Sequence, residues 1–99
     1  MLEKIQALKE DYIASLREDF EMFEALASEI EFGLEEPRTF SELRELAHRI
    51  AGSAGSFGLD ALGSNAKSVD QILTESQAVS AQLSAQLVDL RANFVTAVR

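Results

Sequence analysis

The architecture of this chain can be worked out from Ala47-His48-Arg49-Ile50-Ala51-Gly52-Ser53-Ala54-Gly55-Ser56-Phe57-Gly58. This stretch holds the only histidine of the 99 residues, and glycines follow it at four, seven and ten residues. Apolar residues recur around it at the three- and four-residue steps of one helix face. These are Leu43, Leu46, Ala47, Ile50, Ala54 and Phe57. At about 100° per residue, the His48 side chain points away from that stripe. The outward side also carries Arg44, Ala51, Gly52 and Gly55.

The two glycines after His48 are unusual for a helix. A glycine inside an exposed helix costs about 1 kcal/mol relative to alanine. Here Gly52 and Gly55 lie one and two turns after the histidine. A solvated histidine near a fraying helix end is the ordinary interpretation of a lone surface imidazole. A sequence that breaks a local rule without a need of the fold usually serves a site. The spacing therefore favours an exposed imidazole that another macromolecule can approach.

The run from His48 to Gly58, followed by Leu62, Ala66 and Asp70, resembles the motif of histidine-containing phosphotransfer (HPt) domains. That motif is roughly H-x-L-K-G-S-[AS]-x-x-x-G, then a leucine, a small residue and an acidic residue at similar offsets. The match covers about residues 46–70. The resemblance implies a four-helix bundle whose exposed histidine takes a phosphoryl group from a receiver-domain aspartate and passes it on. The chain departs from the motif at Ala51, where the family usually has a lysine.

Composition limits the class of protein. A hydrophobic fraction of 46% is ordinary for a globular chain, and 99 residues suit one domain, residues 1–99. Without cysteine, neither disulfides nor thiolate metal sites can form. The net charge of −8 disfavours nucleic acid and anionic membrane surfaces as partners. The chain starts with no signal-peptide pattern, so we expect a cytoplasmic protein, and we expect a monomer.

The apolar periodicity predicts four helices and no strand. The first covers about residues 3–33, and a break near Asp11 is left open. The others cover about residues 40–55, 59–73 and 77–98. Because the connections are short, sequential helices should be antiparallel neighbours. The predicted fold class is an all-α, antiparallel up-down four-helix bundle.

Turn residues separate these helices. Gly33 suits the position just past the first helix, and Pro37 prevents its continuation. Residues 39–42, Thr-Phe-Ser-Glu, read as a capping box that opens the histidine helix. Gly58 suits a turn, and residues 74–77 suit the next turn and cap. Gly63, on one flank of its helix with Lys67 and Asp70, indicates either close packing or more open surface.

The aromatic residues divide by their position on the predicted helices. Phe20, Phe23, Phe57 and Phe94 are expected in the core. Phe32 and Phe40 lie near helix ends, where we expect capping contacts, and Tyr12 beside the stripe should be half exposed.

Several chemistries can be weighed against the residues. Glu45 and His48 form one E-x-x-H pair, but both point outward, and no second histidine is present, so no metal site is predicted. No phosphate-binding glycine loop follows a strand, so the chain should not bind ATP. A nucleophilic imidazole needs only access, because histidine is commonly neutral near pH 7. The chain is therefore predicted to be no enzyme and to need no cofactor of its own. The resemblance implies that Mg²⁺ resides in the partner receiver.

The leading hypothesis is a phosphocarrier in two-component signalling. His48 accepts a phosphoryl group from the phospho-aspartate of a receiver domain and passes it to another receiver. Gly52 and Gly55 give the partner access, while Arg44, Ala51 and Lys67 line the contact. Either Arg44 or Lys67 could supply the positive charge that Ala51 lacks.

Two alternatives remain open. The chain could be a docking module that binds a receiver or kinase domain, such as that of a hybrid sensor kinase, without carrying phosphate. It could also be a fragment of a larger kinase.

Overall fold

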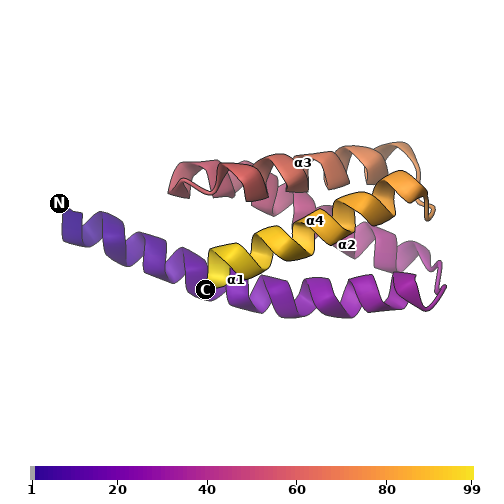
Figure 1. Ribbon diagram of the computed structural model, residues 1–99, viewed down its shortest axis with the longest axis horizontal. Coiled ribbons are helices and arrows are strands. Elements are labelled where there is room, and N and C mark those ends of the chain that lie inside the picture. Colours follow the sequence, from indigo (N-terminus) through magenta and orange to yellow (C-terminus); the bar gives the residue numbers. More distant parts are fainter. Residues whose placement is uncertain (1) are drawn as a thin grey trace.

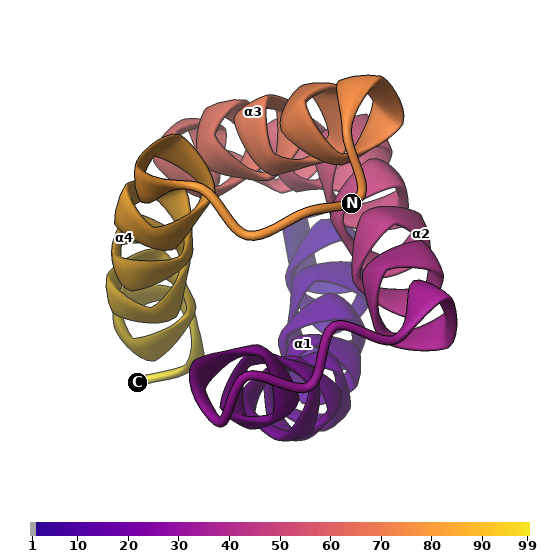
Figure 2. The same ribbon diagram turned by 90° about the vertical axis from the view of Figure 1, so that its right-hand side faces the viewer.

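The structure is a computed structural model that describes residues 2–99, and in that range it is an antiparallel four-helix bundle without strands. Met1, which the predicted domain includes, lies outside the described residues, as does the side chain of Leu2. The elements are α1 (Leu2–Glu31), α2 (Pro37–Ser53), the 3₁₀ turn η1 (Ala54–Phe57), α3 (Asp60–Glu75) and α4 (Ala81–Val98). Viewed along the bundle, the helices form a ring in chain order, with α1 next to both α2 and α4 (Figure 2). The predicted fold class is confirmed.

The core lies along the axis of this ring and is built from the predicted apolar stripes. One stripe of each helix is buried against the other three, as helical amphipathicity requires. The buried apolar residues are Leu16, Phe23, Leu26, Ala27, Ile30, Phe40, Leu43, Leu46, Ala47, Ile50, Ala54, Leu62, Ala66, Val69, Leu73, Leu83, Leu87, Leu90 and Phe94. The outward side of α2 therefore takes no part in the core and faces solvent.

The first helix is continuous, so the break considered near Asp11 is wrong. Residues 8–14 contain neither glycine nor proline, and nothing in that stretch interrupts the hydrogen-bond ladder. A helix of 30 residues is about 45 Å long, which accounts for the 47 Å long axis of the molecule. Residues 3–11 are all exposed, and this end of α1 extends beyond the bundle (Figure 1).

Two glycines end helical segments as expected. Gly33 has φ +80°, and its N–H donates to the carbonyl of Ile30 while the N–H of Leu34 donates to Glu29. Gly58 has φ +77° and stands in the same relation to the end of η1. In both places a left-handed residue satisfies the last carbonyls of a helix, a conformation that suits glycine.

The predicted capping box at the start of α2 is wrong. The helix begins at Pro37, and the side chain of the preceding residue makes no capping hydrogen bond. Proline is tolerated at this first position because its missing N–H has no helical partner there. The Thr39 hydroxyl, fully buried, instead donates to Oε2 of Glu29 at 2.7 Å. The threonine therefore ties α2 to the end of α1.

The remaining boundaries shift by a few residues. The histidine helix, expected over 40–55, changes to 3₁₀ geometry at Ala54. The predicted turn and cap at 74–77 is partly wrong, because Thr74 and Glu75 are still helical. The last helix begins at Ala81 instead, where the Ser80 hydroxyl accepts a hydrogen bond from the Leu83 N–H at 3.0 Å.

The aromatic predictions are partly confirmed. Phe40 is 1% exposed, so the expectation of a capping contact is wrong and this ring belongs to the core. Since α2 begins before Thr39, Phe40 lies within the helix on its buried face. Phe57 is only half buried and stacks on Tyr12 with ring centroids 4.2 Å apart. Tyr12 is half buried, as predicted.

Candidate functional site

His48 lies on the outward side of α2, and its side chain is 73% exposed. The Nδ1 atom of the imidazole is 2.8 Å from Oδ2 of Asp70 on the neighbouring helix α3. The Asp70 side chain is only 17% exposed, so the carboxylate lies low in the seam between the two helices. The predicted exposed imidazole is confirmed, and one of its two nitrogens is engaged.

The carboxylate of Asp70 is shared by three side chains. Its Oδ1 atom is 3.6 Å from Nη1 of Arg44 and 3.5 Å from the hydroxyl of Thr74. A carboxylate only accepts hydrogen bonds, so the Nδ1 atom of His48 donates to it and carries the proton. In the neutral ring the lone pair is then on Nε2. The arrangement leaves Nε2 as the unengaged nitrogen of the ring.

The glycines near His48 have different surroundings. A Cβ atom added at Gly52 would meet nothing within 4 Å, and one at Gly55 would meet only Oδ1 of Asp60, at 3.8 Å. Both glycines are exposed, as predicted. Gly63 is buried, and its Cβ would lie 3.4 Å from that of Ala54 and 3.6 Å from the Gly55 nitrogen. Gly63 therefore permits close packing of α3, whereas Gly52 leaves open surface beside the imidazole.

The antiparallel register of α2 and α3 locates the last two predicted site residues. His48 lies across from Asp70, and Ala54 lies across from Gly63. Lys67, between the two α3 positions, is therefore across from Ala51, one turn after the histidine. Ala51 is half buried and packs against the core, so it lies at the edge of the outward side that it was predicted to share with Gly52. It lies in the seam because its direction from the axis is closer to the buried stripe than that of His48.

The nearby cations differ in their partners. Arg44 is half buried and faces Asp70. Arg49 makes an ion pair with Asp19 on α1 at 2.7 Å, on the other side of α2. Lys67 is exposed and has no ion pair within 4 Å among residues 2–99.

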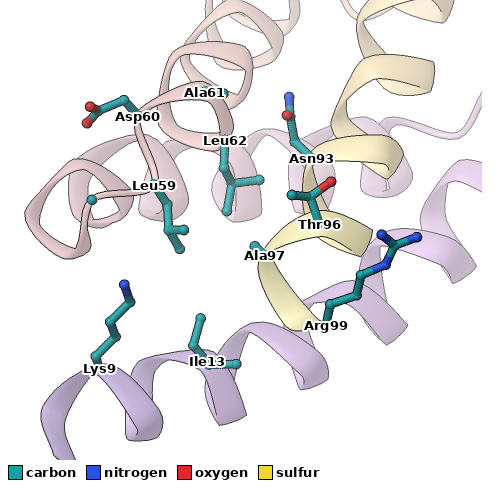
Figure 3. Close-up of a pocket in the computed structure, with 11 residues that line it drawn as sticks. Lys9, Ile13, Leu59, Asp60, Ala61, Leu62, Asn93, Thr96, Ala97 and Arg99 are labelled. Carbon is teal, nitrogen blue, oxygen red and sulfur yellow. The ribbon is translucent and has the colours of Figure 1, made fainter. Parts of the chain in front are cut away.

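Metal-binding groups and the cavity of the bundle can be compared with the position of the histidine. Across the part of the chain that the structure describes, no group of three histidine or acidic side chains could hold a metal ion. A cavity of about 440 Å³ lies between α1, the start of α3 and the end of α4, where Lys9 and Ile13 point toward Leu59 (Figure 3). His48 and Asp70 do not line it.

The sequence pattern alone does not indicate a role for Asp70. The residue was placed only in the motif and on the flank of α3 that carries Gly63 and Lys67. Its position on that flank is the feature that could have indicated its role, because a carboxylate on a neighbouring helix can accept a hydrogen bond from a lone histidine and orient its ring. The pairing itself depends on the register of the two helices.

Fold and site together define a helical bundle that presents a single, carboxylate-held histidine to solvent. A family model, the Hpt domain, matches residues 7–99, nearly the whole chain. The chain belongs to the Hpt domain family, whose members are phosphocarriers of two-component phosphorelays rather than enzymes and interact with receiver domains. Comparison with curated proteins and with solved structures found no match. Among residues 2–99, no helix is long and apolar enough to cross a membrane.

Proposed function

We propose that His48 is the phosphoacceptor, taking a phosphoryl group from the phospho-aspartate of one receiver domain and delivering it to another. The observation that carries this proposal is the 2.8 Å contact between Nδ1 and Asp70 on a side chain that is 73% exposed. Asp70 fixes the orientation of the imidazole through Nδ1, while Nε2 remains accessible to a partner.

The chemistry balances with this protein's atoms and those of the receiver. The Nε2 lone pair attacks the phosphorus, the N–P bond forms, and the bond from phosphorus to the aspartyl oxygen breaks. The receiver recovers a free carboxylate, and the imidazole, still protonated on Nδ1, gains positive charge. Asp70 faces that positive charge directly, which stabilises it as the bond forms. Transfer to a second receiver is the same step in reverse, and Mg²⁺ held by the receiver assists the phosphoryl group.

Access for the receiver comes from the surface beside His48. The receiver must bring its aspartate to the imidazole, and a large side chain one turn away would obstruct it. Gly52 has no side chain, and a Cβ atom placed there would have no neighbouring atom within 4 Å. Arg44, Gly55 and Lys67 would border the same contact, with Ala51 beneath it.

The test is transfer from a labelled receiver. The protein is incubated with a phosphorylated receiver domain, and the label on the bundle is tested for stability. A label that is lost in acid and kept in alkali, and that is absent from His48→Gln, supports the proposal. A label that persists in His48→Gln would place the phosphoryl group elsewhere and contradict it.

A docking module is the second candidate, favoured by alanine rather than lysine at position 51. In that case the bundle binds a receiver without becoming labelled. The same incubation separates the two functions, provided that complex formation is measured alongside the label.

A further inference from the structure

We propose that Lys67, reaching across from α3, neutralises the phosphoryl group on His48. This inference rests on the proposed function, and it chooses between the two cations that the sequence left open.

The site needs an added positive charge when it is phosphorylated. The phosphoryl group brings up to two negative charges to a ring whose Nδ1 atom is 2.8 Å from the Asp70 carboxylate. The chain as a whole already carries −8. Asp70 already opposes the positive charge of the ring, so the negative phosphoryl oxygens are stabilised by a further cation beside them.

Two of the three nearby cations are already occupied. Arg49 pairs with Asp19 at 2.7 Å and faces α1. Arg44 lies 3.6 Å from the same carboxylate that holds the imidazole, and it is half buried. Lys67 has no such partner within residues 2–99 and is exposed, so its ammonium can move to a new anion without breaking an ion pair.

The position of Lys67 fits this task. Gly63, Lys67 and Asp70 follow one another on one flank of α3 at helical spacing. A Cβ atom added at Gly63 would lie against Ala54 and Gly55, and Asp70 contacts His48, so both ends of the flank face α2 and η1. Lys67 therefore lies on α3 along the contact between α2 and α3, across from Ala51 and near His48.

Ala51 and Lys67 are complementary in size. The alanine is half buried against the core, and its side chain is a single methyl group. The flexible four-carbon stem of Lys67 can extend over this short side chain and bring the ammonium toward a group on Nε2. A cation is thus supplied from the facing helix rather than from α2 itself.

The experiment compares Lys67→Ala, the double variant Ala51→Lys with Lys67→Ala, and Lys9→Ala as a control with the same change of net charge. Transfer from a phosphorylated receiver and hydrolysis of the phosphohistidine are both timed. We expect Lys67→Ala to transfer about tenfold more slowly, less than the loss of a catalytic donor in a dry site because this site faces water. The double variant should recover to within about threefold, and Lys9→Ala should match the unaltered protein. The deficit should shrink at high salt, since screening weakens the missing interaction.

Each outcome bears on the inference separately from the function. Normal transfer by Lys67→Ala, with His48 still labelled, overturns the inference and leaves the phosphocarrier intact. A slow Lys67→Ala that the relocated lysine does not rescue also overturns it, because the effect would then come from docking shape rather than charge. Failure of the unaltered protein to label at all contradicts the proposed function itself. Unchanged thermal unfolding of each variant confirms that only the site is altered.

Discussion

Asp70 on α3 holds Nδ1 of His48 on α2 at 2.8 Å, across the seam between the two helices. The carboxylate is mostly buried while the imidazole is mostly exposed, with side-chain exposures of 17% and 73%. The pair therefore fixes the ring from below and leaves its outer nitrogen to solvent. In the proposed transfer, this geometry is what makes the outer nitrogen of His48 available to a receiver.

Replacing Asp70 by alanine should slow transfer without unfolding the bundle. A hydrogen bond to a charged partner contributes about 1.5 kcal/mol, which corresponds to roughly a tenfold change in rate. Transfer from a phosphorylated receiver measures the effect. Asp70→Asn should be intermediate, because its amide oxygen can still accept from Nδ1. Equal rates for the alanine variant and the unaltered protein would show that the contact does not position the ring.

A side chain at Gly52 should block the partner while stabilising the helix. Glutamine suits a helix better than glycine by roughly 0.5–1 kcal/mol, and nothing in the structure obstructs it. Gly52→Gln should therefore raise the free energy of unfolding yet reduce receiver binding several-fold, measured by titration calorimetry. Ala92→Gln, an exposed site on α4, is the matched control and should bind normally. Undiminished binding by Gly52→Gln would mean that the receiver docks elsewhere.

Position 63 should tolerate an alanine side chain but not a leucine side chain. Its Cβ would make ordinary contact with Ala54 at 3.4 Å, so Gly63→Ala should be neutral or slightly stabilising. Gly63→Leu must push α3 away from η1 and should cost about 1–3 kcal/mol in urea unfolding. Gly52→Leu controls for the change in residue type and should lose no stability. If Gly63→Leu were as stable as the parent, the close approach of α3 would be unnecessary.

Tyr12 should anchor the overhanging end of α1. Its ring stacks on Phe57, and its hydroxyl lies 2.7 Å from that of Ser53, which itself donates to the Arg49 carbonyl. Tyr12→Phe keeps the stack and should lose about 0.5–1.5 kcal/mol of stability. Tyr12→Ala should lose more, and amide exchange should quicken over residues 3–11. Exchange as slow as in the parent would indicate that another contact holds this segment.

The fold was largely predictable because each helix carries one clear apolar stripe. The stripe around Leu43 and Ile50 also predicted which side of α2 faces water, and so the exposure of His48. Helix ends were harder, because they depend on single hydrogen bonds. Thr39 has the residue type of a helix cap, yet in the folded chain its hydroxyl finds Glu29, ten residues earlier.

The candidate site was predicted in part for the same reason. Periodicity gives the direction of a side chain on its own helix, which sufficed for His48 and Gly52. It does not give the offset between two helices, and that offset places Asp70 under the imidazole and Lys67 across from Ala51. The packing of Gly63 against Ala54 sets the offset, and this is a tertiary contact.

The most direct test uses the fact that the chain has a single histidine, so one imidazole contributes to its ring spectrum. Long-range ¹H–¹⁵N correlations are recorded before and after incubation with a phosphorylated receiver. The account predicts a proton on Nδ1 of the free ring and a phosphoryl group on Nε2 afterwards. A phosphoryl group on Nδ1, or a ring that the receiver leaves unmodified, would contradict it.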